Sequence, residues 1–209
     1  YVSSGALNNT NGKLAATGVL GIDTNNATLT NSGKGKTVGI EAGVVSLKTG
    51  ALNNSNGQIS GYYVGTQSTS VNNNNGTLNA YGDVDMASTG AVNNTSGLIR
   101  SANGHVKIDA SKNTITNGST KTADTSSNDS LGIIAGEGGI EIASATFNNS
   151  NGQVASSGDI KLLNTANVNH ANGKIVTDKT IAIQAASLNT HQADLSAKTG
   201  ITLEINAGY

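Results

Sequence analysis

Three aspartates in the middle of the sequence are of the residue type that cleaves glycosidic bonds and could lie near one another. Asp83 and Asp85 alternate within one short run, so their side chains share one face of a strand, and Asp109 occurs in a similar run further on. Paired carboxylates at set separations hydrolyse glycosidic bonds, whereas lyases need acidic calcium ligands and a base. The intervening Lys107 offers a simpler account, which is charge pairing between neighbouring strands.

The segment SGKGKT, from Ser32 to Thr37, resembles a phosphate-binding loop. The motif requires a glycine five residues before Gly35, and that position is Thr30. No helical pattern follows to offer its N-terminus to a phosphate. A lysine-bearing turn is therefore the simpler interpretation.

Metal and cofactor chemistry have little support in the sequence. The chain contains no cysteine, which removes thiolate nucleophiles and thiolate ligands. The three histidines, His105, His170 and His191, fall at different points of the repeat described below. We expect no metal, no cofactor and no catalytic residue.

The composition is unusual for a compact domain. Aromatic residues make up 3% and charged residues 12% of the 209 residues, with one Phe and no Pro or Trp. A core built from such residues must be narrow and filled by Val, Ile, Leu and Ala. The net charge of −1 excludes a basic nucleic-acid interface, and no apolar run has the roughly 20 residues of a membrane-spanning helix.

The clearest feature is an internal repeat of about 20 residues. The phrase GALNNTNGKL at Gly5 returns as GALNNSNGQI at Gly50 and as GAVNNTSGLI at Gly90. The apolar residue that anchors each copy is Leu7, Leu29, Leu52, Val71, Val92, Ile115, Phe147, Val168 and Leu188. A glycine follows in most copies, namely Gly12, Gly33, Gly57, Gly76, Gly97, Gly118, Gly152 and Gly173, with Ala193 in the last copy.

Each copy also holds a second phrase, Gly-x-apolar-x-apolar, as in GDVDM from Gly82 and GHVKI from Gly104. Alternation with a period of two, in short β-branched runs between Gly and Asn, is typical of strands and turns. A unit of this length fits one coil of a parallel β-helix, with successive coils about 4.8 Å apart. We therefore predict an all-β fold: one β-helical domain over 1–209, with about nine coils and a length of roughly 40 Å.

Stacking explains why the polar residues repeat as faithfully as the apolar ones. Equivalent residues lie above one another, so the second asparagine of the phrase becomes a buried column that satisfies polar groups at a bend. The predicted column is Asn9, Asn31, Asn54, Asn73, Asn94, Asn117 and Asn149, with His170 and Thr190 in the last two copies. The glycine that follows is expected to supply a positive φ.

The second phrase offers a test of the register. Its middle residue should face solvent, and in four consecutive coils it is Asp85, Lys107, Glu141 and Lys161, which alternate in sign. Stacking would place opposite charges side by side. The third coil (GYYVGTQST) fits poorly, and the sequence does not fix the register near 58–70.

The residues of ALNNTNGKLAATGVLGID, AVNNTSGLIRSANGHVKI and TFNNSNGQVASSGDIKL resemble the haemagglutinin repeats of filamentous-haemagglutinin-like exoproteins. These are Gram-negative surface proteins exported by two-partner secretion, and they include adhesins and the stalks of contact-dependent growth-inhibition toxins. The resemblance covers essentially the whole chain. It implies a right-handed β-helix, export through an outer-membrane barrel partner, display on the cell surface and contact with a receptor on a target cell.

The repeat is interrupted by an enlargement of roughly ten residues in the coil around 114–145. Loops on rigid scaffolds often carry function, so Thr122, Asp124, Asn128 and Asp129 are candidates for recognition; a tolerated surface insertion is the alternative. Tyr62 and Tyr63 are further candidates, because strand alternation would expose one of them for stacking on a sugar or a partner protein.

The functional expectation is a non-enzymatic rod that forms a fragment of a longer secreted exoprotein. It would act in adhesion or as the stalk of a toxin. A dedicated glycan- or receptor-binding module is the second interpretation, and a polysaccharide lyase or hydrolase is the third.

Overall fold

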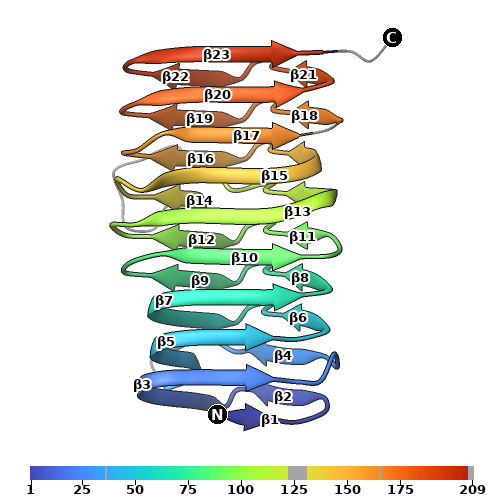
Figure 1. Cartoon of the computed structure of the whole chain (residues 1–209), viewed down its shortest axis with the longest axis vertical. Coiled ribbons are helices and arrows are strands. Elements are labelled where there is room, and N and C mark those ends of the chain that lie inside the picture. Colours follow the sequence, from blue (N-terminus) through green and yellow to red (C-terminus); the bar gives the residue numbers. More distant parts are fainter. Residues whose placement is uncertain (36, 122–130, 165, 207–209) are drawn as a thin grey trace.

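The protein is a β-solenoid of about nine turns, seen here in a computed structural model that describes residues 1–35, 37–121, 131–164 and 166–206. The described strands form one continuous sheet in which every pairing is parallel and joins a strand to its equivalent one coil later. In Figure 1 the chain rises from the N-terminus at the bottom, and its front strands run from left to right while its back strands run from right to left. The winding is therefore right-handed. The predicted all-β, parallel β-helical fold is confirmed.

Three faces of strands surround the axis. The front face contains β1 (Val2–Ser3), β3 (Lys13–Asp23), β5 (Gly39–Lys48), β7 (Gln58–Ser68), β10 (Val84–Ser88), β13 (His105–Thr116), β15 (Gly139–Asn148), β17 (Ile160–Asn164), β20 (Thr180–Ala185) and β23 (Gly200–Ile205). The back face contains β9 (Thr77–Ala80), β12 (Leu98–Ser101), β14 (Gly132–Ala135), β16 (Gln153–Ser156), β19 (Lys174–Thr177) and β22 (Asp194–Ala197). In the first coils β3, β5 and β7 run around the corner and supply both faces.

The third face is short and carries the asparagine phrase. Its strands are β2 (Leu7–Thr10), β4 (Leu29–Ser32), β6 (Ala51–Asn53), β8 (Ser70–Asn72), β11 (Val92–Asn93), β18 (Asn167–Asn169) and β21 (Ser187–Asn189), with the ends of β13 and β15 between them. All nine anchor residues pair with one another in a single register, from Leu7 with Leu29 to Val168 with Leu188. The alignment by repeat therefore gives the correct stacking.

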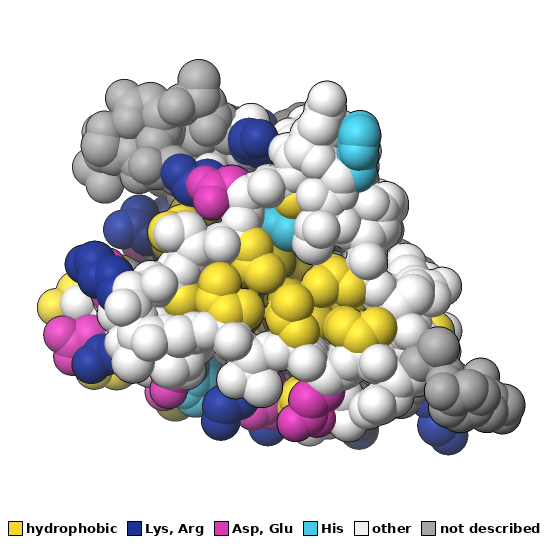
Figure 2. Space-filling model, turned by 90° about the horizontal axis from the view of Figure 1, so that it is seen from above, with side chains coloured by type: hydrophobic (Ala, Val, Ile, Leu, Met, Phe, Trp, Pro, Cys, Tyr) yellow, Lys and Arg dark blue, Asp and Glu magenta, His cyan; other side chains and the backbone are white. Residues whose placement is uncertain are grey.

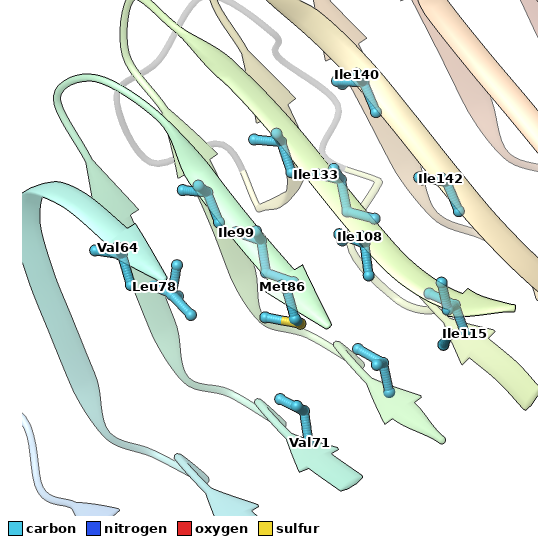
Figure 3. Close-up of a cluster of buried hydrophobic side chains, with 14 of the residues drawn as sticks. Val64, Val71, Leu78, Met86, Ile99, Ile108, Ile115, Ile133, Ile140 and Ile142 are labelled. Atoms are coloured by element: carbon cyan, nitrogen blue, oxygen red, sulfur yellow. The ribbon is translucent and has the colours of Figure 1, made fainter. Parts of the chain in front are cut away.

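The core is a set of apolar columns that run along the axis. Val64, Leu78, Ile99 and Ile108 are buried and point inward from different faces (Figure 3). Seen along the axis, hydrophobic side chains fill the middle of the cross-section and charged side chains lie at its rim (Figure 2). Because the interior is narrow, β-branched residues and leucine fill it without aromatic bulk; Phe147 is fully buried in the anchor column.

Coil three has the same register as its neighbours, and one residue explains why its sequence pattern is obscure. Thr66 pairs with Leu47 on one side and Met86 on the other, so it occupies a position that is apolar in both adjacent coils. Its hydroxyl oxygen is buried without a hydrogen-bond partner in the described structure. A polar residue thus replaces the second apolar residue of the phrase.

Replacing Thr66 with valine should raise the free energy of unfolding by about 1 kcal/mol, because the isosteric change removes a buried hydroxyl that has lost its hydrogen bond with water. Urea denaturation measures the effect. The matched control is Thr24→Val, since the buried Thr24 hydroxyl donates to the Ala27 carbonyl at 2.6 Å and its loss should destabilise. A lower stability for the Thr66 variant would contradict the prediction.

Candidate functional site

The asparagines of the repeat form one hydrogen-bonded column inside the corner that follows the third face. Each Nδ2 donates to the Oδ1 of the asparagine in the next coil. The successive Nδ2–Oδ1 distances are 2.8 Å for Asn9–Asn31, 2.7 Å for Asn31–Asn54, 2.7 Å for Asn54–Asn73, 2.7 Å for Asn73–Asn94, 2.8 Å for Asn94–Asn117 and 2.7 Å for Asn117–Asn149. All seven side chains are buried. Side-chain amides therefore satisfy one another along the axis, as the strands do through their backbones.

The same amides also hold the bend to the back face. Asn31 Nδ2 donates to the Gln58 carbonyl at 3.0 Å, Asn73 Nδ2 to the Leu98 carbonyl at 3.1 Å, and Asn117 Nδ2 to the Gln153 carbonyl at 2.8 Å. Each of these carbonyls belongs to the first residue of a strand in the next coil, namely β7, β12 or β16. The column is thus a structural element that fixes the turn between two faces.

His170 continues the column in the eighth coil. Asn149 Nδ2 lies 3.0 Å from His170 Nδ1, and His170 Nε2 lies 3.0 Å from the Asp194 carbonyl. The amide can only donate, so Nδ1 accepts and Nε2 carries the proton. The neutral imidazole therefore satisfies both neighbours, and burial lowers the pKa of His170, with the Lys121 charge acting in the same direction and Asp194 opposing it.

This arrangement predicts a loss of stability in acid. A lowered pKa in the folded state means that the unfolded chain binds the proton more readily, so the stabilisation is complete above the ordinary value of 6.5 and declines as the pH falls below it. Urea midpoints at pH 7.5 and pH 5 should therefore differ less in His170→Asn than in the unchanged chain. Because the variant retains His105 and His191, an equal pH response in both proteins would contradict the assignment.

The turn after each column asparagine corrects the role expected for glycine. In most coils the positive φ belongs to the residue before the glycine, as in Asn56 (φ 54°), Asn75 (φ 52°) and Ser96 (φ 52°), whereas in the second coil Gly33 itself has it (φ 108°), as predicted. Gly57, Gly76 and Gly97 are required for space instead: a Cβ on Gly76 would lie 2.2 Å from the Asn54 carbonyl oxygen. Asparagine tolerates the left-handed conformation, which explains its frequency there.

The alignment of Gly118 with these glycines is also wrong. Its carbonyl accepts from the Ser96 N–H, as the Thr95 carbonyl does from Asn75, so Gly118 is the equivalent of Thr95. Ser119 has the positive φ of 55° in this coil. The enlargement therefore begins after a complete turn, and the next back strand, β14, resumes the register with Leu98 opposite Gly132.

The first residues of the enlargement are anchored to the following coils. Thr120 is buried, and its hydroxyl accepts from the Gln153 N–H at 2.8 Å. Lys121 Nζ donates to the Asn172 carbonyl at 3.0 Å. The recognition candidates Thr122, Asp124, Asn128 and Asp129 lie outside the described residues.

The other two recognition candidates, Tyr62 and Tyr63, are adjacent in the sequence but differ in exposure and in the face on which they lie. Tyr62 is 63% exposed at the corner between the back and front faces, and its ring centroid is 5.6 Å from that of Tyr81, which is 61% exposed in the next coil. Tyr63 is half-buried on the front face, where its ring covers Gly65. Together with Tyr1, all four described tyrosines belong to the first four coils.

A groove lies on the outer surface of the front face in the same part of the molecule, over β3, β5, β7, β10 and β13. We call it the front groove; its volume is about 430 Å³, and its lining includes Tyr1, Ser46, Tyr63, Gln67, Asp85 and Asp109. Its hollow arises because one outward-facing column consists of Gly21, Ser46 and Gly65 in three successive coils. A second hollow of about 520 Å³ shares Gln67, Ala87 and Asp109 with it.

The acidic residues that could do chemistry are engaged in local pairs. His105 lies between two carboxylates, with Nδ1 3.1 Å from Asp83 Oδ1 and Nε2 3.0 Å from Asp85 Oδ1. Lys107 Nζ pairs with Glu141 Oε1 at 2.8 Å. The charged residues Asp85, Lys107, Glu141 and Lys161 do stack in the expected order, although Asp85 contacts His105 at hydrogen-bond distance.

Other candidates receive no support from the geometry. Gly33 and Gly35 have positive φ in a turn, and the described chain has no helix whose N-terminus could face a phosphate. Within the ranges that the structure describes, no cluster of three or more His, Cys, Asp or Glu residues is placed to hold a metal ion. A helix long and apolar enough to cross a membrane is likewise absent from those ranges.

Sequence reasoning missed a second polar column at the corner after the front face. It contains Thr24, Thr49, Ser68, Ser88, Ser144 and Asn164, with hydroxyl contacts such as Thr49 to Ser68 at 3.0 Å and Ser144 to Asn164 at 2.6 Å. The signal was available, because these residues follow the second phrase at a constant offset. Their types vary more than those of the asparagine column, so the repeat is harder to see.

Comparison with known proteins does not add a relative. No family model, no curated protein and no solved structure matches this chain.

Proposed function

We propose that this chain is a non-enzymatic rod segment of a secreted exoprotein on the surface of a Gram-negative bacterium. The rod holds an adhesive or toxic portion away from the cell, where that portion contacts a receptor on a target cell. Export would use an outer-membrane barrel partner, as the resemblance to haemagglutinin repeats implies. The proposal rests on that resemblance and on one structural observation.

The observation is the unbroken register of the stack. Anchor residues pair from the first coil to the ninth, and the enlargement after β13 does not shift them, since Ile115 pairs with Phe147. Stability in such arrays is a sum of coil and nearest-neighbour terms. A continuous stack with side-chain columns as well as strand ladders resists bending, which suits a spacer.

Shortening the rod in register tests the proposal. Deleting residues 71–114 from the displayed exoprotein would stack Ile115 directly on Leu52. The deletion removes two coils, or about 10 Å of length. We expect the shortened protein to fold and be displayed, to stand closer to the cell, and to reach target cells less efficiently. Full target binding by this chain displayed alone would contradict a spacer role.

A dedicated glycan- or receptor-binding module is the second candidate. All four described tyrosines belong to the first four coils, and Tyr1 and Tyr63 line the front groove, which favours this candidate because a passive spacer has no need of aromatic rings gathered in a few neighbouring coils. Deleting 120–130, which keeps the turn residue Ser119 and joins it to Leu131, separates two versions of this candidate: unchanged target binding would show that the enlargement is not the recognition element.

Polysaccharide cleavage is the third interpretation, and we propose that it does not occur. Asp83 and Asp85 contact the same imidazole ring, which fits a structural cluster of polar side chains. Incubation with acidic and neutral polysaccharides, with and without calcium, should yield no new reducing or unsaturated ends. Appearance of such ends would overturn the non-enzymatic assignment.

A further inference from the structure

We propose that the front groove binds an unbranched, neutral glycan that lies along the rod axis, with Tyr63 as its principal stacking residue. This inference deepens the second candidate function by naming the ligand class and the site. It is carried by the shape of the groove, by its side chains and by its charge.

The shape follows from small residues in register. Gly21, Ser46 and Gly65 pair in sequence across β3, β5 and β7, so no large side chain of this column rises from the floor along three coils, and the rings of Tyr1 and Tyr63 lie over its two glycines. Asp85 and Lys107 occupy the next two positions of the same column and close the hollow at that end. The groove is therefore elongated along the axis and has a definite end.

The spacing of the floor suits an extended chain of sugars. Successive coils are about 4.8 Å apart, which is close to the advance of one pyranose ring per linkage in an extended glycan. A glycan laid along the axis would thus present one ring to each coil. A peptide strand has little to gain here, because the backbone groups of the floor already pair with the coils above and below.

Two tyrosine rings lie on this floor. A Cβ built on Gly65 would be 2.8 Å from Cε1 and Oη of Tyr63, and one on Gly21 would be 2.8 Å from Cδ2 of Tyr1, so each ring rests on a glycine. Burial and the nearby Asp85 carboxylate raise the pKa of Tyr63. The contact with Gly65 holds the ring against the floor, and the neutral hydroxyl offers a donor and oxygen lone pairs to a ligand hydroxyl.

The remaining polar groups suit hydroxyl-rich ligands. Gln67 offers both a donor and an acceptor, and Ser46 offers a hydroxyl. The ionisable aspartates and lysines of the lining are Asp23, Asp85, Asp109, Lys48 and Lys107, with a formal sum of −1. Both lysines pair with carboxylates, Lys48 with Asp23 at 3.0 Å and Lys107 with Glu141 at 2.8 Å. A sulfated or sialylated chain would therefore meet no unpaired lysine in the described groove.

The test is a glycan array probed with the full chain, containing cello-, chito-, malto- and galacto-oligosaccharides beside sulfated and sialylated glycans. We expect binding to at least one neutral, unbranched series, confirmed by calorimetry. Tyr63→Ala should weaken it about tenfold or more, whereas Tyr63→Phe should retain most of it. Tyr81→Ala is the control for losing a tyrosine ring, because Tyr81 is exposed to solvent but does not line the groove.

Urea denaturation of each variant shows whether the fold is kept. Should Tyr63→Ala unfold, Gln67→Ala and Ser46→Asn provide a second test, since the first removes a polar contact and the second fills the floor. Binding to no neutral glycan, preference for sulfated or sialylated chains, binding only to a protein receptor, or equal loss in Tyr81→Ala would each overturn the proposal. Because the assay uses the isolated chain, it can fail while the spacer role stands, and the reverse also holds.

Discussion

Replacing Asn73 with alanine is expected to lower the free energy of unfolding by about 3 kcal/mol or more. Asn73 lies in the middle of the column, where its Oδ1 accepts from Asn54 and its Nδ2 donates to Asn94 and to the Leu98 carbonyl. The substitution removes these hydrogen bonds and a longer one from Nδ2 to the Gly76 carbonyl at 3.3 Å, and it leaves partners on both sides buried. An unsatisfied buried polar group costs about 1–3 kcal/mol.

The isosteric variant Asn73→Asp distinguishes hydrogen bonding from packing. The carboxylate would keep the shape but would place oxygen against the Asn94 oxygen and the Leu98 carbonyl, in a site from which water is excluded. We expect it to be at least as destabilising as alanine at neutral pH. If the aspartate variant were as stable as the unchanged chain, the column would be a packing feature only.

Two asparagines serve as controls, with stability measured by urea denaturation and hydrogen exchange of the surrounding coils. Asn9 is the first member of the column and accepts no hydrogen bond from a preceding column residue in the described structure, so Asn9→Ala should cost less than Asn73→Ala. Asn79 faces outward and is only half-buried on β9, and Asn79→Ala should change stability by about 0.5 kcal/mol or less.

Replacing Gly76 with alanine should destabilise the chain by a comparable amount, about 3 kcal/mol, through steric conflict. The added Cβ would lie 2.2 Å from the Asn54 carbonyl oxygen and 2.5 Å from Asn73 Oδ1. Neither atom can retreat easily, since the first belongs to the backbone of the adjacent coil and the second is fixed in the column. The change therefore disturbs the column without altering any of its members.

The control for this prediction is Gly118→Ala, where the nearest atom to an added Cβ is the Ser150 carbonyl oxygen at 3.5 Å. That variant should retain the stability of the unchanged chain. Similar urea midpoints for the Gly76 and Gly118 variants would show that the coils can separate to admit a methyl group, and the close-packing explanation of the glycine would be wrong.

Much of the fold is predictable because stacking converts sequence repetition into spatial alignment. The anchor residues and the asparagines recur with one spelling, so the amino-acid sequence alone is enough to assign their register. Coil three is different, because Thr66 interrupts an apolar column and Gly65 carries no information about which way its neighbours face. Glycine and asparagine are both common in turns, and the sequence pattern favours glycine for the left-handed conformation. That prediction is wrong at Asn56 and Asn75, where asparagine adopts it.

The front groove is less predictable than the column. Its floor depends on Gly21, Ser46 and Gly65 being neighbours, and these residues share no motif that a reader would align. The pairing of Asp85 with His105 depends on side-chain conformation in adjacent coils, which repetition alone does not determine. Tyr62 and Tyr63 draw attention through rarity, but only the structure separates the exposed corner residue from the one that covers a glycine.

The hydrogen bonds of the asparagine column all point the same way, and this gives assembly a direction. In each pair from Asn9 to Asn149 the earlier residue donates to the later one. A partly formed stack therefore ends in an amide donor that awaits the next winding, as well as in a strand edge that templates it. Contacts separated by about one repeat close with a small entropy cost however long the array becomes. The chain can consequently fold vectorially, with each winding added to the one before it.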